Sequence, residues 1–182
     1  MWKYIAIDES NHGRSPEIFV ATYSKTDTDG FVYSRTILPK YRNKHWERSG
    51  RLNERDYRFI IADKTILDLI SEEALLGSVV SSFVGYASEK EELTIPFTLL
   101  IDGKLDTEKI EEIYRRLRND RRIKERDFTL IMGSHLDQRN QLVNISDERA
   151  HILYKRPLEK IVEDNKRIIL EIPRGLKRKS KI

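Results

Sequence analysis

The chain has 182 residues and no cysteine, and its 34 Lys and Arg against 30 Asp and Glu give a net charge of only +4. The lack of cysteine excludes a disulfide framework and a thiolate metal site, and no apolar run is long enough for a transmembrane helix. With 38% apolar and 35% charged residues, the composition predicts one folded domain with a heavily charged surface. The N-terminal apolar stretch is too short for a signal peptide, so we expect a cytoplasmic protein that does not bind a membrane.

The first third of the chain predicts strands. Residues 2–8 are apolar, and "EIFVATYS" at 17–24 is rich in β-branched and aromatic residues. The turn residues of "TDTDG" at 26–30 predict that "FVYSRTILP" at 31–39 pairs back as a third antiparallel strand. Residues 41–55 are basic and include Trp46, and we expect them to form a long loop. Its aromatic residues either stack on the bases of a nucleic acid while the basic ones contact phosphates, or the loop is simply solvated.

The rest of the chain alternates between helical and strand patterns. Helical spacing predicts helices over 57–67, 72–92, 106–120 and 146–156, although the Val pairs of 72–92 would also suit a strand. We expect Asp106 or Thr107 to cap the third of these helices and Ser146 the fourth. Strands are predicted at 95–103 and 127–133, and 158–170 is a helix or a helix that runs into a strand. This order predicts an α/β fold with a mixed sheet and helices packed on it.

The final residues differ in composition from the rest. We expect one domain over 1–172 and a basic tail over 173–182, which contains Arg174, Lys177, Arg178, Lys179 and Lys181 and no acid. Such a tail is either a solvated terminus or an arm that contacts phosphates.

Carboxylates follow the ends of predicted strands. "YIAIDES" brings a buried strand to Asp8 and Glu9, and "LLIDG" brings another to Asp102. An Asp in such a place is often a turn residue or a helix cap, and the helix dipole favours an acid such as Asp147 in a first turn. Two adjacent acids after a buried strand are harder to explain in this way, because each resists desolvation and the two repel.

A divalent cation would offset both of these costs. If the strands that end on Asp8 and Asp102 are parallel neighbours, the two carboxylates lie about 5 Å apart at one edge of the sheet. An all-carboxylate set suits Mg²⁺ or Mn²⁺, and two such ions can clamp the attacking and leaving oxygens of a phosphodiester.

The order and spacing of these strands, helices and carboxylates over roughly residues 3–155 resemble those of the ribonuclease H-like superfamily. It is most similar to ribonuclease HII, which opens on a strand ending in Asp-Glu and has an inner strand ending in "IDG". It also resembles uncharacterised proteins of that fold with "DES" at the first strand and an Asp on a late helix, for which "NQLVNISDERAHIL" is the better match. The resemblance implies a mixed five-stranded sheet flanked by helices.

The resemblance also implies roles for individual residues. Asp8, Glu9 and Asp102 match the family's metal ligands, and the last ligand is Asp147, with Asp137 as the alternative. Ribonuclease HII has a Gly-Arg-Gly turn after Asp-Glu, whereas this chain has Asn11 and His12 before Gly13, so a specificity for RNA–DNA junctions does not carry over with the fold. Residues expected near nucleic acid are Asn11, His12, Arg14 and Lys104.

The function expected from these residues is that of a nuclease dependent on two Mg²⁺ or Mn²⁺ ions, which hydrolyses phosphodiester bonds of RNA, RNA–DNA hybrid or structured DNA. A second hypothesis is a nucleic-acid-binding module of the same fold without efficient chemistry. A third is a small-molecule phosphohydrolase that uses the same carboxylates.

Overall fold

The computed structural model of the chain describes residues 1–10, 15–25, 56–90, 92–119, 123–138, 140–170 and 172. The predicted strand at 31–39, the basic loop at 41–55 and the tail at 173–182 lie outside these residues. Within the described residues no helix is long and apolar enough to cross a membrane.

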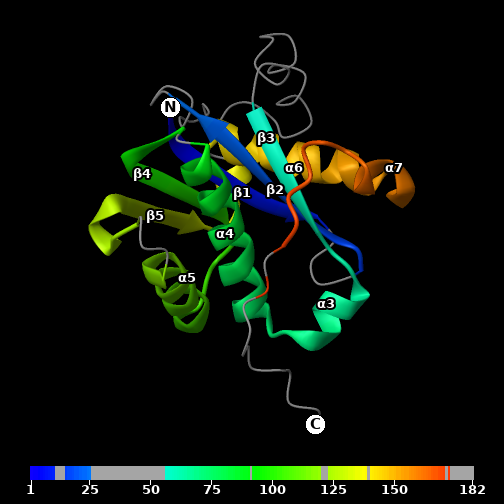
Figure 1. Cartoon of the computed structure of the whole chain (residues 1–182), viewed down its shortest axis with the longest axis horizontal. Helices are drawn as coiled ribbons and strands as arrows, with labels where there is room; N and C mark the ends of the chain where they lie inside the picture. Colours follow the sequence, from blue (N-terminus) through cyan, green and yellow to red (C-terminus); the bar gives the residue numbers. More distant parts are fainter. Residues whose placement is uncertain are drawn as a thin grey trace.

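The core is a five-stranded sheet in the order β3-β2-β1-β4-β5 (Figure 1). Its strands are β1 (Trp2–Ser10), β2 (Glu17–Ser24), β3 (Asp56–Ala62), β4 (Leu93–Asp102) and β5 (Phe128–Gly133). β1 pairs antiparallel with β2, and β2 pairs antiparallel with β3. On its other side β1 pairs parallel with β4, which pairs parallel with β5. The antiparallel and parallel halves therefore meet at β1, as the predicted fold requires.

Helices cover both faces of this sheet (Figure 1). They are α3 (Lys64–Leu69), α4 (Glu72–Glu89), α5 (Thr107–Asn119), α6 (Gln141–Tyr154) and α7 (Leu158–Val162), with short 3-10 turns η2 (Glu125–Asp127) and η3 (Leu136–Gln138). One face carries the main core, in which Ile5 and Ile7 of β1 pack with α4 residues such as Val80 and Phe83. On the other face Ala6 of β1 packs with Leu142 and Val143 of α6. Successive residues of β1 thus point to opposite layers.

The predicted helix over 57–67 is wrong, because its first half is strand β3. Phe59 and Ile61 pack in the cluster that includes Ala150 of α6, whereas Ile60 and Ala62 pack in the α4 cluster. A strand that is buried on both faces has an apolar run that imitates helical spacing. The helix begins only after Asp63, whose carboxylate accepts a hydrogen bond from Ile66 N at 2.9 Å.

Several other predictions are confirmed. Residues 72–89 form a helix and not a strand, and α5 begins after Asp106, which accepts a hydrogen bond from Lys109 N at 2.8 Å. Ile113 and Leu117 lie on the buried stripe of α5. In the region 158–170 a short helix is followed by an isolated bridge between Arg167 and Phe59 of β3.

The prediction of Ser146 as a helix cap is wrong. Helix α6 begins earlier, and Asn140 caps it by accepting hydrogen bonds from the N–H groups of Leu142 and Val143. The first turn looked like loop in the sequence because polar residues precede it, but Leu142, Val143 and Ile145 are fully buried. Their packing against the sheet, and not a capping serine, determines where this helix starts.

Candidate active site

Asp8 lies near the end of β1, which stays paired with β2 beyond its apolar residues. It lies opposite Val20 of β2, and only 8% of it is exposed. Asp8 Oδ1 accepts a hydrogen bond from Glu9 N at 2.7 Å. Since Ala6 faces α6, Asp8 two residues later faces the same layer. The strand therefore presents a nearly buried carboxylate to the side of the sheet that α6 covers.

Asp102 is the last residue of β4, the parallel neighbour of β1. The register pairs Ile7 with Ile101, so one step further brings Asp102 beside Asp8. Asp102 Oδ1 accepts hydrogen bonds from Leu136 N at 2.5 Å and from Asp137 N at 3.3 Å, which hold the carboxylate against η3. The chain leaves the strand through Gly103, whose φ of 99° lies in the left-handed region that favours glycine.

Asp147 comes from the middle of α6 and not from its first turn. The helix dipole is felt mainly in the first and last turns, so it does not explain an acid at this position. The neighbouring Ser146 is fully buried, and its Oγ lies 2.9 Å from both Ala6 O and Thr22 Oγ1. This contact places α6 directly over β1 and β2, next to Asp8.

The electrostatics of Asp8 relate it to the two other aspartates. Burial raises the pKa of Asp8 well above its usual range, and the charges of Asp147 and Asp102 raise it further. The hydrogen bond from Glu9 N lowers the pKa, and the Glu9 charge raises it slightly. Asp8, Asp102 and Asp147 therefore form one cluster on the α6 face, which we call the aspartate cluster. Carboxylates in this arrangement favour either a proton or a cation between them.

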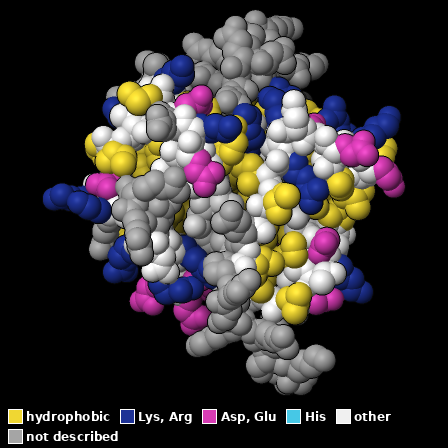
Figure 2. All heavy atoms as spheres, viewed as in Figure 1, with side chains coloured by type: hydrophobic (Ala, Val, Ile, Leu, Met, Phe, Trp, Pro, Cys, Tyr) yellow, Lys and Arg dark blue, Asp and Glu magenta, His cyan; other side chains and the backbone are white. Residues whose placement is uncertain are grey.

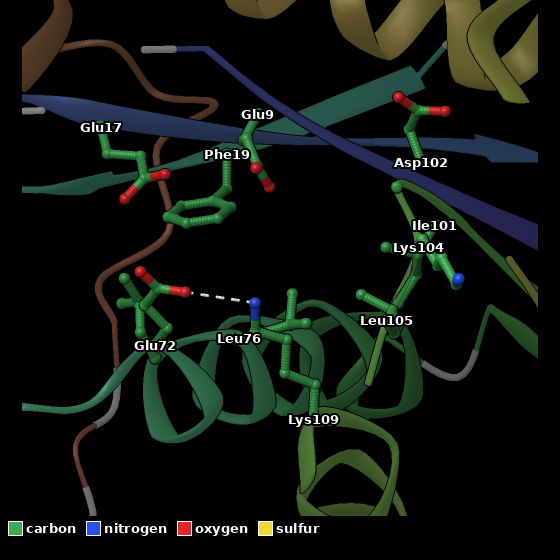
Figure 3. Close-up of a pocket in the computed structure, with 12 residues that line it drawn as sticks. Glu9, Glu17, Phe19, Glu72, Leu76, Ile101, Asp102, Lys104, Leu105 and Lys109 are labelled. Carbon is green, nitrogen blue, oxygen red and sulfur yellow. Dashed lines mark hydrogen bonds and ion pairs between the residues drawn. The ribbon is translucent and has the colours of Figure 1, made fainter. Parts of the chain in front are cut away.

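Glu9 is directed to the other face of the sheet. Figure 3 shows its carboxylate pointing into a pocket of about 290 Å³ beside α4, whereas the carboxylate of Asp102 points away from that pocket. Glu72 and Lys109 also line the pocket, and they form an ion pair of 3.2 Å. Lys104 lines it too and is exposed. The Asp-Glu pair that the sequence singled out is thus divided between two faces.

The remaining predicted residues take different places. Asp137 contacts Asp102 through its main-chain N–H, and its charge is not among the causes that shift Asp8, unlike that of Asp147. Asn11, His12 and Arg14 lie outside the described residues.

The aspartate cluster fits a hard divalent cation in the chemistry of its donors, all of which are carboxylate oxygens. A cation would also offset the burial and the mutual repulsion that raise the pKa of Asp8. Among the described residues, however, no three acidic or histidine side chains are close enough to hold an ion as they stand. Like charges repel, so the carboxylates are not expected to approach one another more closely without a bound cation.

Two buried polar side chains escaped the sequence analysis. Asn144 is 4% exposed and Ser10 is 9% exposed, and neither Asn144 Oδ1 nor Ser10 Oγ has a hydrogen-bond partner among the described residues. Ser10 follows Asp8 by two residues on the same face of β1. Asn144 precedes Asp147 by three residues in α6. Because the predicted helix began only at residue 146, the sequence analysis could not relate these two residues by helical spacing.

Charge on the molecular surface is mixed. On the face drawn in Figure 2, basic and acidic side chains are interspersed, and apolar ones are exposed among them. The most exposed apolar residue of the described chain beyond α7 is Ile169, at 76%. The described residues on this face thus form no single basic groove, and the most basic segments of the sequence lie outside the described residues.

Comparisons with known proteins agree with this architecture. No protein-family model and no curated protein matches the sequence. Among solved structures, the chain is similar to ribonuclease HII of Archaeoglobus fulgidus, solved in a complex with PCNA, with a TM-score of 0.57 and 14% identity over 88% of this chain and 77% of that one. It is also similar to ribonuclease H2 of Pyrococcus horikoshii OT3, with a TM-score of 0.53 and 15% identity over 88% of this chain and 76% of that one. The chain has the ribonuclease H-like fold.

Proposed function

We propose that the protein is a nuclease that depends on Mg²⁺ or Mn²⁺ and hydrolyses phosphodiester bonds of RNA, RNA–DNA hybrid or structured DNA. The observation that carries this proposal is the buried Asp8, whose pKa is raised by its burial and then by the charges of Asp147 and Asp102. Maintaining three carboxylates together costs stability, and a fold retains such an arrangement most often at a functional site.

The proposal assigns the cation to Asp8, Asp102 and Asp147. A bound Mg²⁺ or Mn²⁺ would supply positive charge that stabilises the negative charge developing on a phosphodiester. The chain's part is to hold the carboxylates in place: the N–H groups of η3 orient Asp102, and Ser146 seats α6 so that Asp147 faces β1. Asp8 is shielded from bulk water by its burial, which strengthens its attraction for a cation.

Among the four ligands predicted from the sequence, Glu9 is the weakest candidate, because its side chain is directed into the pocket on the α4 face. We therefore expect Glu9→Gln to retain more activity than Asp8→Asn. Similarly, Asp147→Asn is expected to abolish activity and Asp137→Asn to reduce it only modestly, since of these two acids only Asp147 is among the charges that raise the pKa of Asp8. Lys104, Asn11, His12 and Arg14 are proposed to contact the nucleic acid.

The experiment measures Mn²⁺-dependent cleavage of labelled RNA–DNA hybrid, single-stranded RNA and branched DNA. Wild type is compared with Asp8→Asn and Asp147→Asn, and Asp137→Asn serves as the matched control from the neighbouring turn η3. Cleavage that the first two substitutions abolish and the control retains would support the nuclease. Cleavage that survives Asp8→Asn would refute it.

A second candidate is a nucleic-acid-binding module of the same fold without efficient chemistry. It is favoured by the lack of a closed ligand set among the described acidic and histidine side chains. This candidate predicts no cleavage of any of the three substrates, together with salt-sensitive binding that Asp8→Asn leaves intact.

A further inference from the structure

Strand β5 lies at an outer edge of the sheet, and no described strand pairs with its outer side (Figure 1). The opposite edge is covered by the chain itself: Phe59 N of β3 donates to Lys166 O at 3.1 Å, and Ile168 N donates to Phe59 O at 2.7 Å. An uncovered edge strand directs a row of N–H and C=O groups outward, where another strand can pair with them. The described part of the chain therefore leaves one edge of its sheet open.

The sequence of β5 has none of the features that usually protect an edge strand. The segment "FTLIMG" contains no charged residue and no proline, and its pairing with β4 runs from Phe128 to Gly133 without a register shift. Natural edge strands are commonly protected by lysine, by proline or by a bulge. A regular, uncharged edge of this kind is a surface along which another strand can pair.

Apolar side chains are exposed on both faces of this edge. Leu130 packs against the α4 cluster, so Met132 faces the same layer and Ile131 faces the α6 layer. Met132 is nevertheless 39% exposed, and Ile131 is 43% exposed. Helix α6 is anchored over β1 and β2 through Ser146, so it leaves Ile131 uncovered. A strand added beside β5 would cover part of both side chains.

The occupant that fits this edge best is β5 of a second copy of the chain. Because the strand is uncharged, pairing it with itself brings no like charges opposite one another. Since the described chain has one open edge, two copies that pair through β5 use both open edges, and assembly stops at a dimer. A strand of the basic tail at 173–182 would instead offer Ile131 and Met132 mainly Lys and Arg side chains.

We propose that the chain forms a two-fold dimer in which β5 pairs antiparallel with β5 of a second copy, giving one continuous sheet with five strands from each copy. A two-fold axis perpendicular to the sheet keeps both α6 helices on one side and places the middle of β5 opposite itself. The carboxyl ends of β1 and β4 then point in opposite directions in the two copies, so the dimer presents its two aspartate clusters at opposite edges of one sheet. Only six residues of each copy pair, so the interface is small and the dimer dissociates on dilution. This inference does not depend on the proposed function, because it rests on the edge of the sheet and not on the acidic residues.

Sedimentation velocity of the full chain over a wide range of concentrations tests this proposal. We expect wild type to dimerise reversibly. Ile131→Lys places a lysine from each copy at the paired edge and should raise the dimer dissociation constant at least about 10-fold. Leu158→Lys changes a residue of α7 that is similarly exposed, at 45%, and this matched control should dimerise as wild type does. Thermal unfolding of both variants verifies that they are folded.

Disulfide cross-linking identifies the strand that pairs, because the chain has no cysteine of its own. Thr129→Cys/Ile131→Cys places two thiols on one face of β5, so antiparallel pairing about the middle of the strand brings thiols of the two copies opposite each other. We expect disulfide-linked dimers to form rapidly from this variant. Ile152→Cys/Leu158→Cys, at sites of similar exposure on α6 and α7, is the control and should form them only slowly.

The outcomes separate the possible occupants of the edge. A wild type that stays monomeric up to about 1 mM would overturn the proposal, and if such a monomer binds an extended apolar peptide along β5, the edge takes a different strand. A dimer that persists unchanged in Ile131→Lys uses another surface and would equally overturn it. If Ile131→Lys does not fold, the cross-linking decides: a wild-type dimer whose β5 cysteines react no faster than the control pair does not contain this interface.

Discussion

Two glycines of helix α4 allow a matched test of how closely α4 and α5 pack. A Cβ atom built on Gly77 lies 2.7 Å from Glu112 Cγ and 3.2 Å from Arg116 Cγ, whereas a Cβ atom built on Gly85 has no atom within 4 Å. Carbon atoms prefer separations of about 3.5–4.0 Å, so an alanine at position 77 must displace Glu112. Glu112 resists this displacement, because it accepts hydrogen bonds from Arg115 at 2.7 Å and from the buried Arg116 at 2.7 Å.

The expected changes in the free energy of unfolding have opposite signs for the two substitutions. Replacing glycine by alanine inside a helix contributes about 0.5–1 kcal/mol of stability, and this gain should appear in full in Gly85→Ala. In Gly77→Ala the overpacking costs about 1–3 kcal/mol, which exceeds the gain. We therefore expect Gly77→Ala to be destabilised by roughly 1–2 kcal/mol and the two variants to differ by about 2 kcal/mol.

Urea unfolding followed by circular dichroism measures both values, and the slope of the transition shows whether the unfolded state has changed. A double-mutant cycle with Glu112→Ala isolates the contact: without Cγ of Glu112, the Gly77→Ala substitution should cost at least about 1 kcal/mol less. If Gly77→Ala proves as stable as Gly85→Ala, the close approach of α4 and α5 described above is refuted.

Three further predictions concern the aspartate cluster and α6. Ser146→Ala leaves Ala6 O without this partner and should lower the free energy of unfolding by about 1–3 kcal/mol; an unchanged urea midpoint would contradict this. Burial raises the pKa of Asp8 above its ordinary value of 3.8, so its stabilising contribution is fully present below about pH 4 and is lost as the pH rises through the folded-state pKa. In EDTA, Asp8→Asn should therefore be more stable than wild type at pH 7.5 but not at pH 3.5, and equal differences at both pH values would argue against this cause. Asn140→Ala removes the α6 cap and should cost about 1 kcal/mol, a loss that thermal unfolding would detect and that Asn140→Asp should largely restore.

The sequence predicted those parts of the site that depend on local patterns. An apolar run ending on an acid indicates a strand end, and β1 and β4 both have this pattern, so Asp8 and Asp102 could be placed at one edge of the sheet. The same local pattern could not show that Asp8 and Glu9 face different layers, because that depends on how far β1 stays paired with β2. In the structure the pairing extends to Ser10 opposite Ile18, which keeps the alternation of faces intact.

Longer-range packing decided what the sequence could not predict. The run from Tyr57 to Ala62 suits both a helix and a strand, and its pairing with β2 over the whole length of β3 settles the choice. Likewise, the start of α6 depends on the burial of Leu142 and Val143 against β1 and β4. Because that start was placed five residues too late, Asn144 was assigned to a loop and its helical relation to Asp147 was missed.

The contact between Ser146 and Ala6 joins residues 140 positions apart in the chain. Joining such distant segments carries a large loop-closure entropy and makes a contact of high contact order. Asp147, which is next to Ser146, therefore reaches Asp8 only when the sheet and α6 have assembled. During synthesis, a chain that has emerged only as far as β5 has Asp8 and Asp102 but not the third aspartate. Any affinity for a divalent cation that depends on all three should consequently arise late in folding, as a property of the completed domain.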